Sequence, residues 1–132
     1  MLLKLDNPEQ VAPPMGAYSH SVEIPANSGL IFLSGQVPVG LDGRTPATLA
    51  EQADQVYANI VAVLAAKGVT PEAVIKLVTY LVEDDAAGAV PRARARHFGD
   101  HRPASTLLYV KGLANPAWKV EVEAIALASP AV

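Results

Sequence analysis

The segment IKLVTYLV, residues 75–82, carries apolar side chains at both odd and even positions. Because the side chains of a strand alternate between the two faces of a sheet, this pattern predicts a strand that is buried on both faces. The segment LIFLSGQV, residues 30–37, has the same character. Together the two segments indicate a sheet whose two faces both need cover.

Two segments are predicted to form helices. Thr48 followed by Glu51 fits a capping box, apolar residues recur at helical spacing behind them, and Gly68 is placed to end the helix. These signals predict a helix over residues 48–67. Residues 90–98 are predicted to form a second helix, with a proline in its first turn.

Strand-like segments fill most of the remaining chain, at residues 19–24, 105–110 and 118–127. The predicted order is β-β-α-β-α-β-β, a single α+β domain over residues 1–132 in which two helices cover one face of a sheet. Since two helices cover only one face, we expect a second copy of the chain to cover the other. A monomer whose long loops fold over the sheet is the alternative.

The composition excludes several classes of protein. The 132 residues are 51% hydrophobic and include no cysteine, so disulfides, thiol nucleophiles and cysteine zinc sites are absent. The net charge of −3 offers no general attraction for nucleic acid. The first residues are too polar for a signal peptide, and no apolar run is long enough to span a bilayer. We therefore expect a cytoplasmic protein with no membrane or nucleic-acid partner.

The histidines and arginines of residues 92–101 give weak support for a metal or phosphate site. His97 and His101 have i, i+4 spacing, but no HExxH motif accompanies them, so a solvent-facing pair is favoured over a metal site. The alternating arginines of RARAR, residues 92–96, are spread around the helix and indicate a solvated face. Their expected acidic partners are Asp84, Asp85 and Asp100. No nucleotide-binding motif occurs, so no cofactor is predicted.

Two strand positions are candidates for chemistry. Glu121 and Glu123 are predicted to share one face of the last strand, roughly 7 Å apart along it. Paired carboxylates raise each other's pKa and suit general acid–base work, although an ordinary polar face with Lys119 as a neutralising neighbour is the alternative. Residues 34–36, Ser-Gly-Gln, interrupt an apolar strand, which indicates either the close approach of a ligand or of another backbone, or a simple bulge.

Taken together, these segments resemble the YjgF/RidA family, whose members are also called reactive intermediate deaminases or L-PSP endoribonucleases. The resemblance implies a chorismate-mutase-like α+β domain that forms a homotrimer, with small-molecule clefts between subunits and hydrolysis of enamines or imines such as 2-aminoacrylate. The residues that carry it are GAYSHSV (16–22), SGQVPV (34–39), the 48–67 helix with Gln52 and Asn59, IKLVTYLV (75–82), RPAS (102–105) and VEVEAIA (120–126).

The resemblance also implies roles for individual residues. Glu121 matches the carboxylate placed near the attacking water, which it would orient and deprotonate. Ser34 would hydrogen-bond that water, and Tyr18 matches the tyrosine that lines the cleft. Backbone groups of Gly35 and Leu107 would hold the substrate.

The chain departs from the family's pattern at the proposed cleft. The family's carboxylate-binding arginine falls at Ser105, the family's cysteine at Leu107, and an asparagine of many members near Pro91. A neutral serine cannot form the bidentate pair of an arginine, so we expect an altered substrate class, with Arg102 as the replacement cation. The alternative is a trimer that binds a small metabolite without catalysis. RNA cleavage follows only from the family's older name, and the acidic balance disfavours it.

Overall fold

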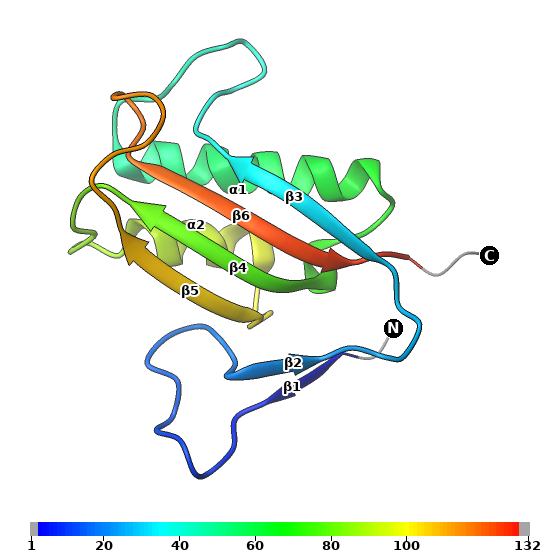
Figure 1. Ribbon diagram of the computed structural model, residues 1–132. Coiled ribbons are helices and arrows are strands. Elements are labelled where there is room, and N and C mark those ends of the chain that lie inside the picture. The colour runs from blue at the N-terminus through cyan, green and yellow to red at the C-terminus, as the bar shows by residue number, and fades with distance from the viewer. Residues whose placement is uncertain (1–2, 130–132) are drawn as a thin grey trace.

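The computed structural model describes residues 3–129, in which two helices lie against the same face of a four-stranded sheet (Figure 1). The helices are α1 (Leu49–Ala66) and α2 (Ala89–Phe98), and a 3₁₀ turn, η1 (Pro71–Ala73), precedes the fourth strand. The strands are β1 (Lys4–Asp6), β2 (Ser21–Glu23), β3 (Leu30–Gln36), β4 (Val74–Leu81), β5 (Ala104–Tyr109) and β6 (Val120–Leu127). The α+β fold class predicted from the sequence is confirmed.

The main sheet has the strand order β3-β6-β4-β5. Strands β4 and β5 are parallel and are connected through α2, whereas β6 runs antiparallel to both β3 and β4. The last strand therefore lies in the middle of the sheet, where it is paired on both edges. Its alternate residues are buried because they face the helices that cover one side of the sheet.

The amino-terminal strands form a separate ladder. β2 pairs with β1, a strand of three residues that the sequence did not indicate because it is too short to show a pattern. Hydrogen bonds of Ser19 join this ladder to the main sheet, since its backbone N–H donates to the Pro103 carbonyl at 3.1 Å and its hydroxyl to the Arg102 carbonyl at 2.6 Å. The strand predicted over 19–24 is thus present but shorter, and it is paired outside the main sheet.

Helix α1 begins where the sequence indicates. The Thr48 hydroxyl accepts a hydrogen bond from the Glu51 backbone N–H at 3.2 Å and donates to the Glu51 carboxylate at 2.8 Å. Val56, Ile60 and Leu64 are fully buried against the sheet. The helix therefore stabilises one face of the sheet through a continuous apolar stripe.

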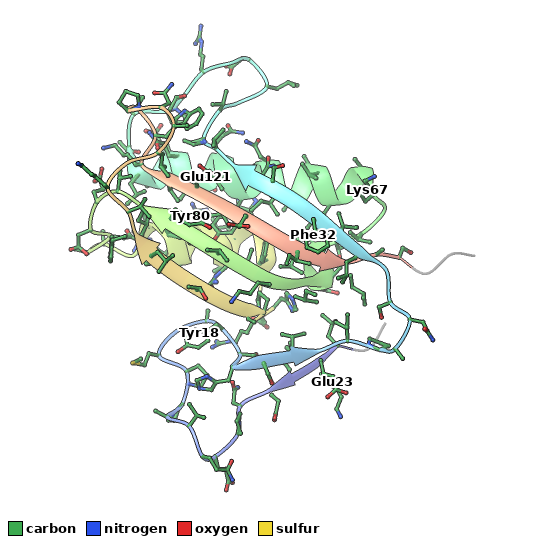
Figure 2. All side chains as sticks on the ribbon, viewed as in Figure 1. Tyr18, Glu23, Phe32, Lys67, Tyr80 and Glu121 are labelled. Carbon is green, nitrogen blue, oxygen red and sulfur yellow. The ribbon has the colours of Figure 1, made fainter. Side chains whose placement is uncertain are left out.

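The opposite face of the sheet is open in the single chain. Tyr80, Glu121 and Phe32 project from this face (Figure 2). Phe32 is 72% exposed, which is unusual for an aromatic residue in a strand. One chain therefore leaves this face of the sheet without cover, as the doubly apolar strands predicted.

The side chains of α2 have partners that differ from those expected. Asp54 of α1, rather than the three aspartates expected from the sequence, accepts hydrogen bonds from Arg96 at 3.1 Å and lies 2.9 Å from His97 Nε2. The hydrogen bond from His97 and, to a smaller degree, that from Arg96 lower the pKa of the Asp54 carboxyl. His101 instead contacts the Val74 carbonyl at 2.6 Å. The expectation failed because packing of α2 on α1 cannot be read from local spacing.

Within residues 3–129, no helix is both long and apolar enough to cross a membrane.

Candidate functional site

The open face of the sheet carries a cluster of polar side chains. Tyr80 of β4 is paired with Glu121 of β6, and Val78 with Glu123, so these side chains share one face. The Tyr80 hydroxyl donates a hydrogen bond to the Glu123 carboxylate. The prediction that the two glutamates lie on one face is confirmed.

The Glu121 carboxylate lies directly over the backbone of Gly35. A Cβ atom added to Gly35 would be 1.9 Å from Glu121 Oε2, so no larger residue fits without displacing the carboxylate. The register of β3 against β6 shifts between Leu33 and Gln36, as in a β-bulge. The bulge predicted for the Ser34–Gln36 interruption is therefore present, and the group that comes close to the glycine is the side chain of Glu121.

The electrostatics of this cluster separate Glu121 from an ordinary surface glutamate. Burial, followed by the negative charge of Glu123, raises the pKa of the Glu121 carboxyl. The hydrogen bond to Glu123 is the main cause that raises the pKa of the Tyr80 hydroxyl. A carboxyl whose pKa moves towards neutrality is better able to exchange protons with a substrate or a water molecule.

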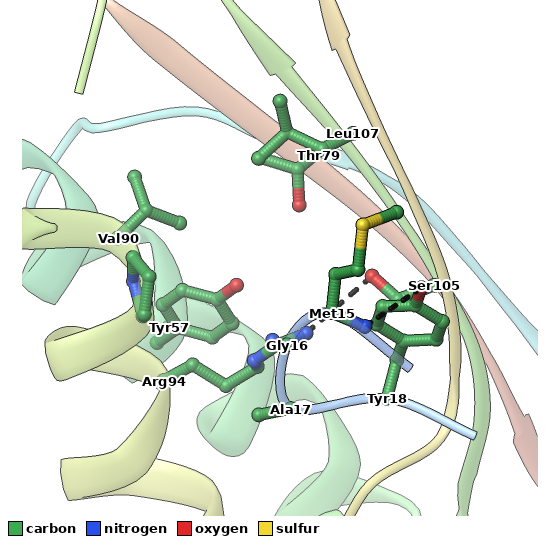
Figure 3. A pocket seen from close by; sticks show the side chains of 11 residues that line it. Met15, Gly16, Ala17, Tyr18, Tyr57, Thr79, Val90, Arg94, Ser105 and Leu107 are labelled. Carbon is green, nitrogen blue, oxygen red and sulfur yellow. Dashed lines mark hydrogen bonds between the residues drawn. The ribbon is translucent and has the colours of Figure 1, made fainter. Parts of the chain in front are cut away.

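A cavity of about 480 Å³ lies on the other side of the sheet, where α2, β5 and the segment before β2 meet (Figure 3). Leu107 is paired with Thr79 and Ser105 with Leu77, so both face the helices and not the open face. The lining residues are Met15, Gly16, Ala17, Tyr18, Tyr57, Thr79, Val90, Pro91, Arg94, Ser105 and Leu107.

The polar groups of the cavity come from α1, α2, β4, β5 and the segment before β2. Arg94 of α2 donates a hydrogen bond to the Ser105 hydroxyl at 3.4 Å. The Tyr18 hydroxyl accepts from the Met15 backbone N–H at 3.2 Å, which closes the segment that forms one wall. The hydroxyls of Tyr57 and Thr79 point into the space from the helix side and the sheet side (Figure 3).

The site residues predicted from the sequence fall into two groups. Glu121, Ser34 and Gly35 lie at the open face, whereas Tyr18, Ser105 and Leu107 line the cavity. Because the sheet separates the two groups, a single chain does not bring them into one site. A site that contains all six residues therefore needs parts of two chains.

The arginine that lines the cavity differs from the one predicted. Arg102 does not line it, since this residue is exposed in the turn before β5 and its carbonyl is held by Ser19. The guanidinium present there belongs to Arg94. Sequence reasoning missed Arg94, Tyr57 and Thr79, because the alternating arginines look equivalent and the other two resemble ordinary core residues.

The sequence and the fold of this chain are similar to those of known proteins. The family model described as Endoribonuclease L-PSP matches residues 9–128. Protein HMF1 of Saccharomyces cerevisiae is 32% identical over 119 residues, which are 89% of each chain. The Rid family protein YyfB from Yersinia pestis, of unknown function, superposes with a TM-score of 0.85 at 33% identity, over 96% of this chain and 99% of that one. TdcF of Escherichia coli, solved with bound serine, gives a TM-score of 0.70 at 25% identity, over 96% and 99% of the two chains.

Proposed function

The chain belongs to the YjgF/RidA family, the family of the Endoribonuclease L-PSP model, and on that premise we propose that it is a deaminase-like hydrolase of small enamines, imines or related metabolites. The observation that carries the proposal is the Glu121 carboxyl, which lies against Gly35 with a raised pKa. A relative, Escherichia coli TdcF, is named a putative reactive intermediate deaminase, which supports the same chemistry.

The proposed chemistry assigns one proton shuttle to Glu121. Its carboxylate takes a proton from water as the water oxygen bonds to the carbon of a protonated C=N group. The resulting carbinolamine receives that proton on nitrogen. As its C–N bond breaks, Glu121 takes the proton of the carbinol hydroxyl, so that ammonia and a carbonyl product leave, and this last proton passes to the ammonia. The hydroxyl of Ser34, the residue before Gly35 in the register shift of β3, would hold the attacking water.

We propose that the complete cleft forms between subunits of a homotrimer. In one chain the sheet separates Glu121 from Tyr18 and Ser105, and the open face exposes Phe32. A second copy placed on that face would cover the apolar surface and supply the missing half of the site. The ligand is proposed to be small, as is the serine bound to TdcF, and the cytoplasm remains the predicted location.

The substrate class is proposed to differ from that of deaminases with an arginine at position 105. Ser105 offers a neutral hydroxyl there, which makes no bidentate contact with a carboxylate. The same observation favours the second candidate function, a trimer that binds a small metabolite in these clefts without catalysis.

Replacement of Glu121 tests the proposed hydrolysis. Glu121→Gln should lower turnover of imines generated by an amino acid oxidase by about 10²-fold or more, because the amide keeps the shape but cannot carry the proton. Activity should fall at low pH as Glu121 becomes protonated. Glu123→Gln, on the same strand face, should retain turnover and move that fall to lower pH, because a like charge that raises the pKa of Glu121 is removed.

Three results of this assay separate the candidate functions. Loss of turnover in Glu121→Gln alone supports hydrolysis at this carboxyl. Equal rates in the wild type and Glu121→Gln would move the chemistry to another group. A wild type that binds small metabolites and turns over neither these imino acids nor neutral imines would favour the binding protein.

A further inference from the structure

Among the described residues that line the cavity, Arg94 carries the only charge. Its neighbours along α2 are occupied elsewhere, since Arg96 is paired with Asp54 and Arg92 donates to the Ala87 carbonyl. Arg94 has no acidic partner within residues 3–129, and its hydrogen bond to Ser105 is long at 3.4 Å. A guanidinium has five N–H donors, so most of the donors of Arg94 have no partner among the described residues.

The second observation is the Tyr57 hydroxyl. Tyr57 is 0% exposed, and its hydroxyl makes no hydrogen bond of normal geometry in the part of the chain that the structure describes, although the Thr79 hydroxyl lies near it. The hydroxyl points into the cavity, and the hydroxyl of Thr79, a residue 2% exposed, points in from the sheet (Figure 3). A buried hydroxyl without a partner is costly, and a ligand atom in the cavity would remove that cost.

The remaining walls define what lies beside these polar groups. Leu107, Val90 and Met15 give the cavity an apolar lining, and its volume of about 480 Å³ suits a small organic molecule. A fitting ligand therefore carries an anionic group at one end, a short apolar body and a hydrogen-bonding atom near Tyr57.

We propose that this cavity binds a small carboxylate, with the carboxylate oxygens on the Arg94 guanidinium and a second polar group of the ligand on the Tyr57 hydroxyl. Ser105 then has a role of its own, since its short side chain leaves room for the guanidinium and orients it. An arginine at position 105 would add a second positive charge to the cavity that Arg94 already lines. The proposal rests on the proposed function only in taking this ligand to be the substrate. It narrows the altered substrate class to carboxylates that are held by an arginine of α2 instead of an arginine at position 105.

The experiment compares an acid with its neutral isostere. Isothermal titration of 2-oxobutanoate and 2-oxobutanamide into the wild type should show the acid binding at least about 10-fold more tightly, the size expected of a charge-assisted pair. Arg94→Gln should abolish this preference. Arg94→Lys should keep part of it, because the ammonium keeps the charge but not the fork. Arg92→Gln, an exposed arginine on the same helix, is the matched control and should bind as the wild type does.

Tyr57→Phe supplies an independent readout. The variant should bind both compounds more weakly while the ligand-free protein melts at a higher temperature, because an unpartnered buried hydroxyl has been removed. A higher melting temperature with unchanged binding of both compounds would show that the hydroxyl does not meet the ligand and would overturn its assignment.

The outcomes for this inference differ from those for hydrolysis. Equal binding of acid and amide to the wild type, binding of neither, or a preference that survives Arg94→Gln would each overturn the carboxylate site. Selective acid binding that is retained in Glu121→Gln would support it, whether or not turnover is observed. If Arg94→Gln loses the preference for the acid but still turns over neutral imines, the proposed hydrolysis is supported. Arg94 would then determine which substrates bind.

Discussion

Gly35 and Glu121 act as one unit at the scale of single residues, because the carboxylate occupies the space where any other residue at position 35 would place its Cβ. Glycine in a strand weakens the strand, so a glycine at this point has a local reason. The reason here is that the Glu121 carboxylate, whose pKa is raised, packs against the backbone of the glycine. The glycine thus belongs to the candidate site although it contributes no side chain.

Gly35→Ala should leave the fold intact and lower imine turnover, on the order of 10²-fold if the carboxylate moves by about 1 Å. The new Cβ would lie 1.9 Å from Glu121 Oε2, and the end of a flexible side chain moves more easily than the sheet does. Circular dichroism and the oxidase-coupled assay measure the two effects. Gly112→Ala is the control, because nothing lies within 4 Å of its added Cβ. Full turnover in Gly35→Ala would contradict the positioning of Glu121.

The raised pKa of Glu121 also predicts how stability depends on pH. In the folded chain the carboxyl pKa lies above its ordinary value of 4.5, mainly because of burial, so the folded state binds the proton more tightly than the unfolded state. The free energy of unfolding therefore falls as pH rises from 4.5 through the folded-state pKa, and stays lower above it.

Glu121→Gln should accordingly melt at a higher temperature than the wild type at pH 7, because an ionised carboxylate that folding disfavours has been removed. The difference should vanish below about pH 4.5, where the wild-type carboxyl is protonated in both states. Melting curves at pH 4 and pH 7 measure it. A variant that melts lower than the wild type at pH 7 would show that the ionised carboxylate is stabilised in the folded protein.

At the scale of elements, helix α2 decides which arginine reaches the cavity. Asp85 holds the start of this helix, since its carboxylate accepts hydrogen bonds from the backbone N–H groups of Ala89 at 2.7 Å and Val90 at 2.9 Å. The sequence suggested Asp85 as a partner for the arginines, but the structure uses it as a cap. Gly88, at the N-cap, has a φ of 70° and no side chain to do this.

Asp85→Ala should lower the free energy of unfolding by about 0.5–2 kcal/mol, the usual cost of losing a helix cap. Denaturant unfolding measures this loss. Asp84→Ala is the matched control, because the adjacent Asp84 accepts a 3.2 Å hydrogen bond from the exposed Tyr109 hydroxyl and contacts no helix end. Equal losses in the two variants would show that Asp85 does not cap α2.

At the scale of the whole molecule, one chain folds into a sheet that is covered on one side only (Figure 1). The uncovered face holds both the exposed Phe32 and the proposed catalytic carboxyl of Glu121. Assembly and chemistry are therefore linked in the proposed trimer, since the surface that needs a partner also holds half of the site.

Phe32→Glu should convert a trimer into monomers that remain folded, because the side chain is 72% exposed in the single chain and would be buried only by a partner. Light scattering should give about three times the 13.8 kDa chain mass for the wild type and one chain mass for the variant. Leu41→Glu, at a fully exposed loop position, is the control and should remain trimeric. A wild type of monomer mass across micromolar concentrations would refute the trimer.

The sequence by itself determined the class of fold and the nature of most elements, because these depend on local periodicity and capping. The helix expected over 48–67 is α1, the strand expected over 75–82 is β4, and the shared face of Glu121 and Glu123 follows from the alternation of a strand. The ends of elements, the three-residue β1, the turn η1 and the pairing of β2 outside the main sheet differ from the prediction, since hydrogen bonds at an end and between strands depend on partners distant in the chain.

The tertiary structure alone decided which residues meet. Equally spaced arginines became different groups, as Arg96 found Asp54 while Arg94 entered the cavity beside Ser105. The side chains of Glu121 and Ser105 lie on opposite faces of the sheet, although the sequence predicts only that each residue belongs to a strand. The physical reason is that alternation within a strand fixes which neighbours share a face, whereas only packing of helices onto the sheet decides what each face contacts.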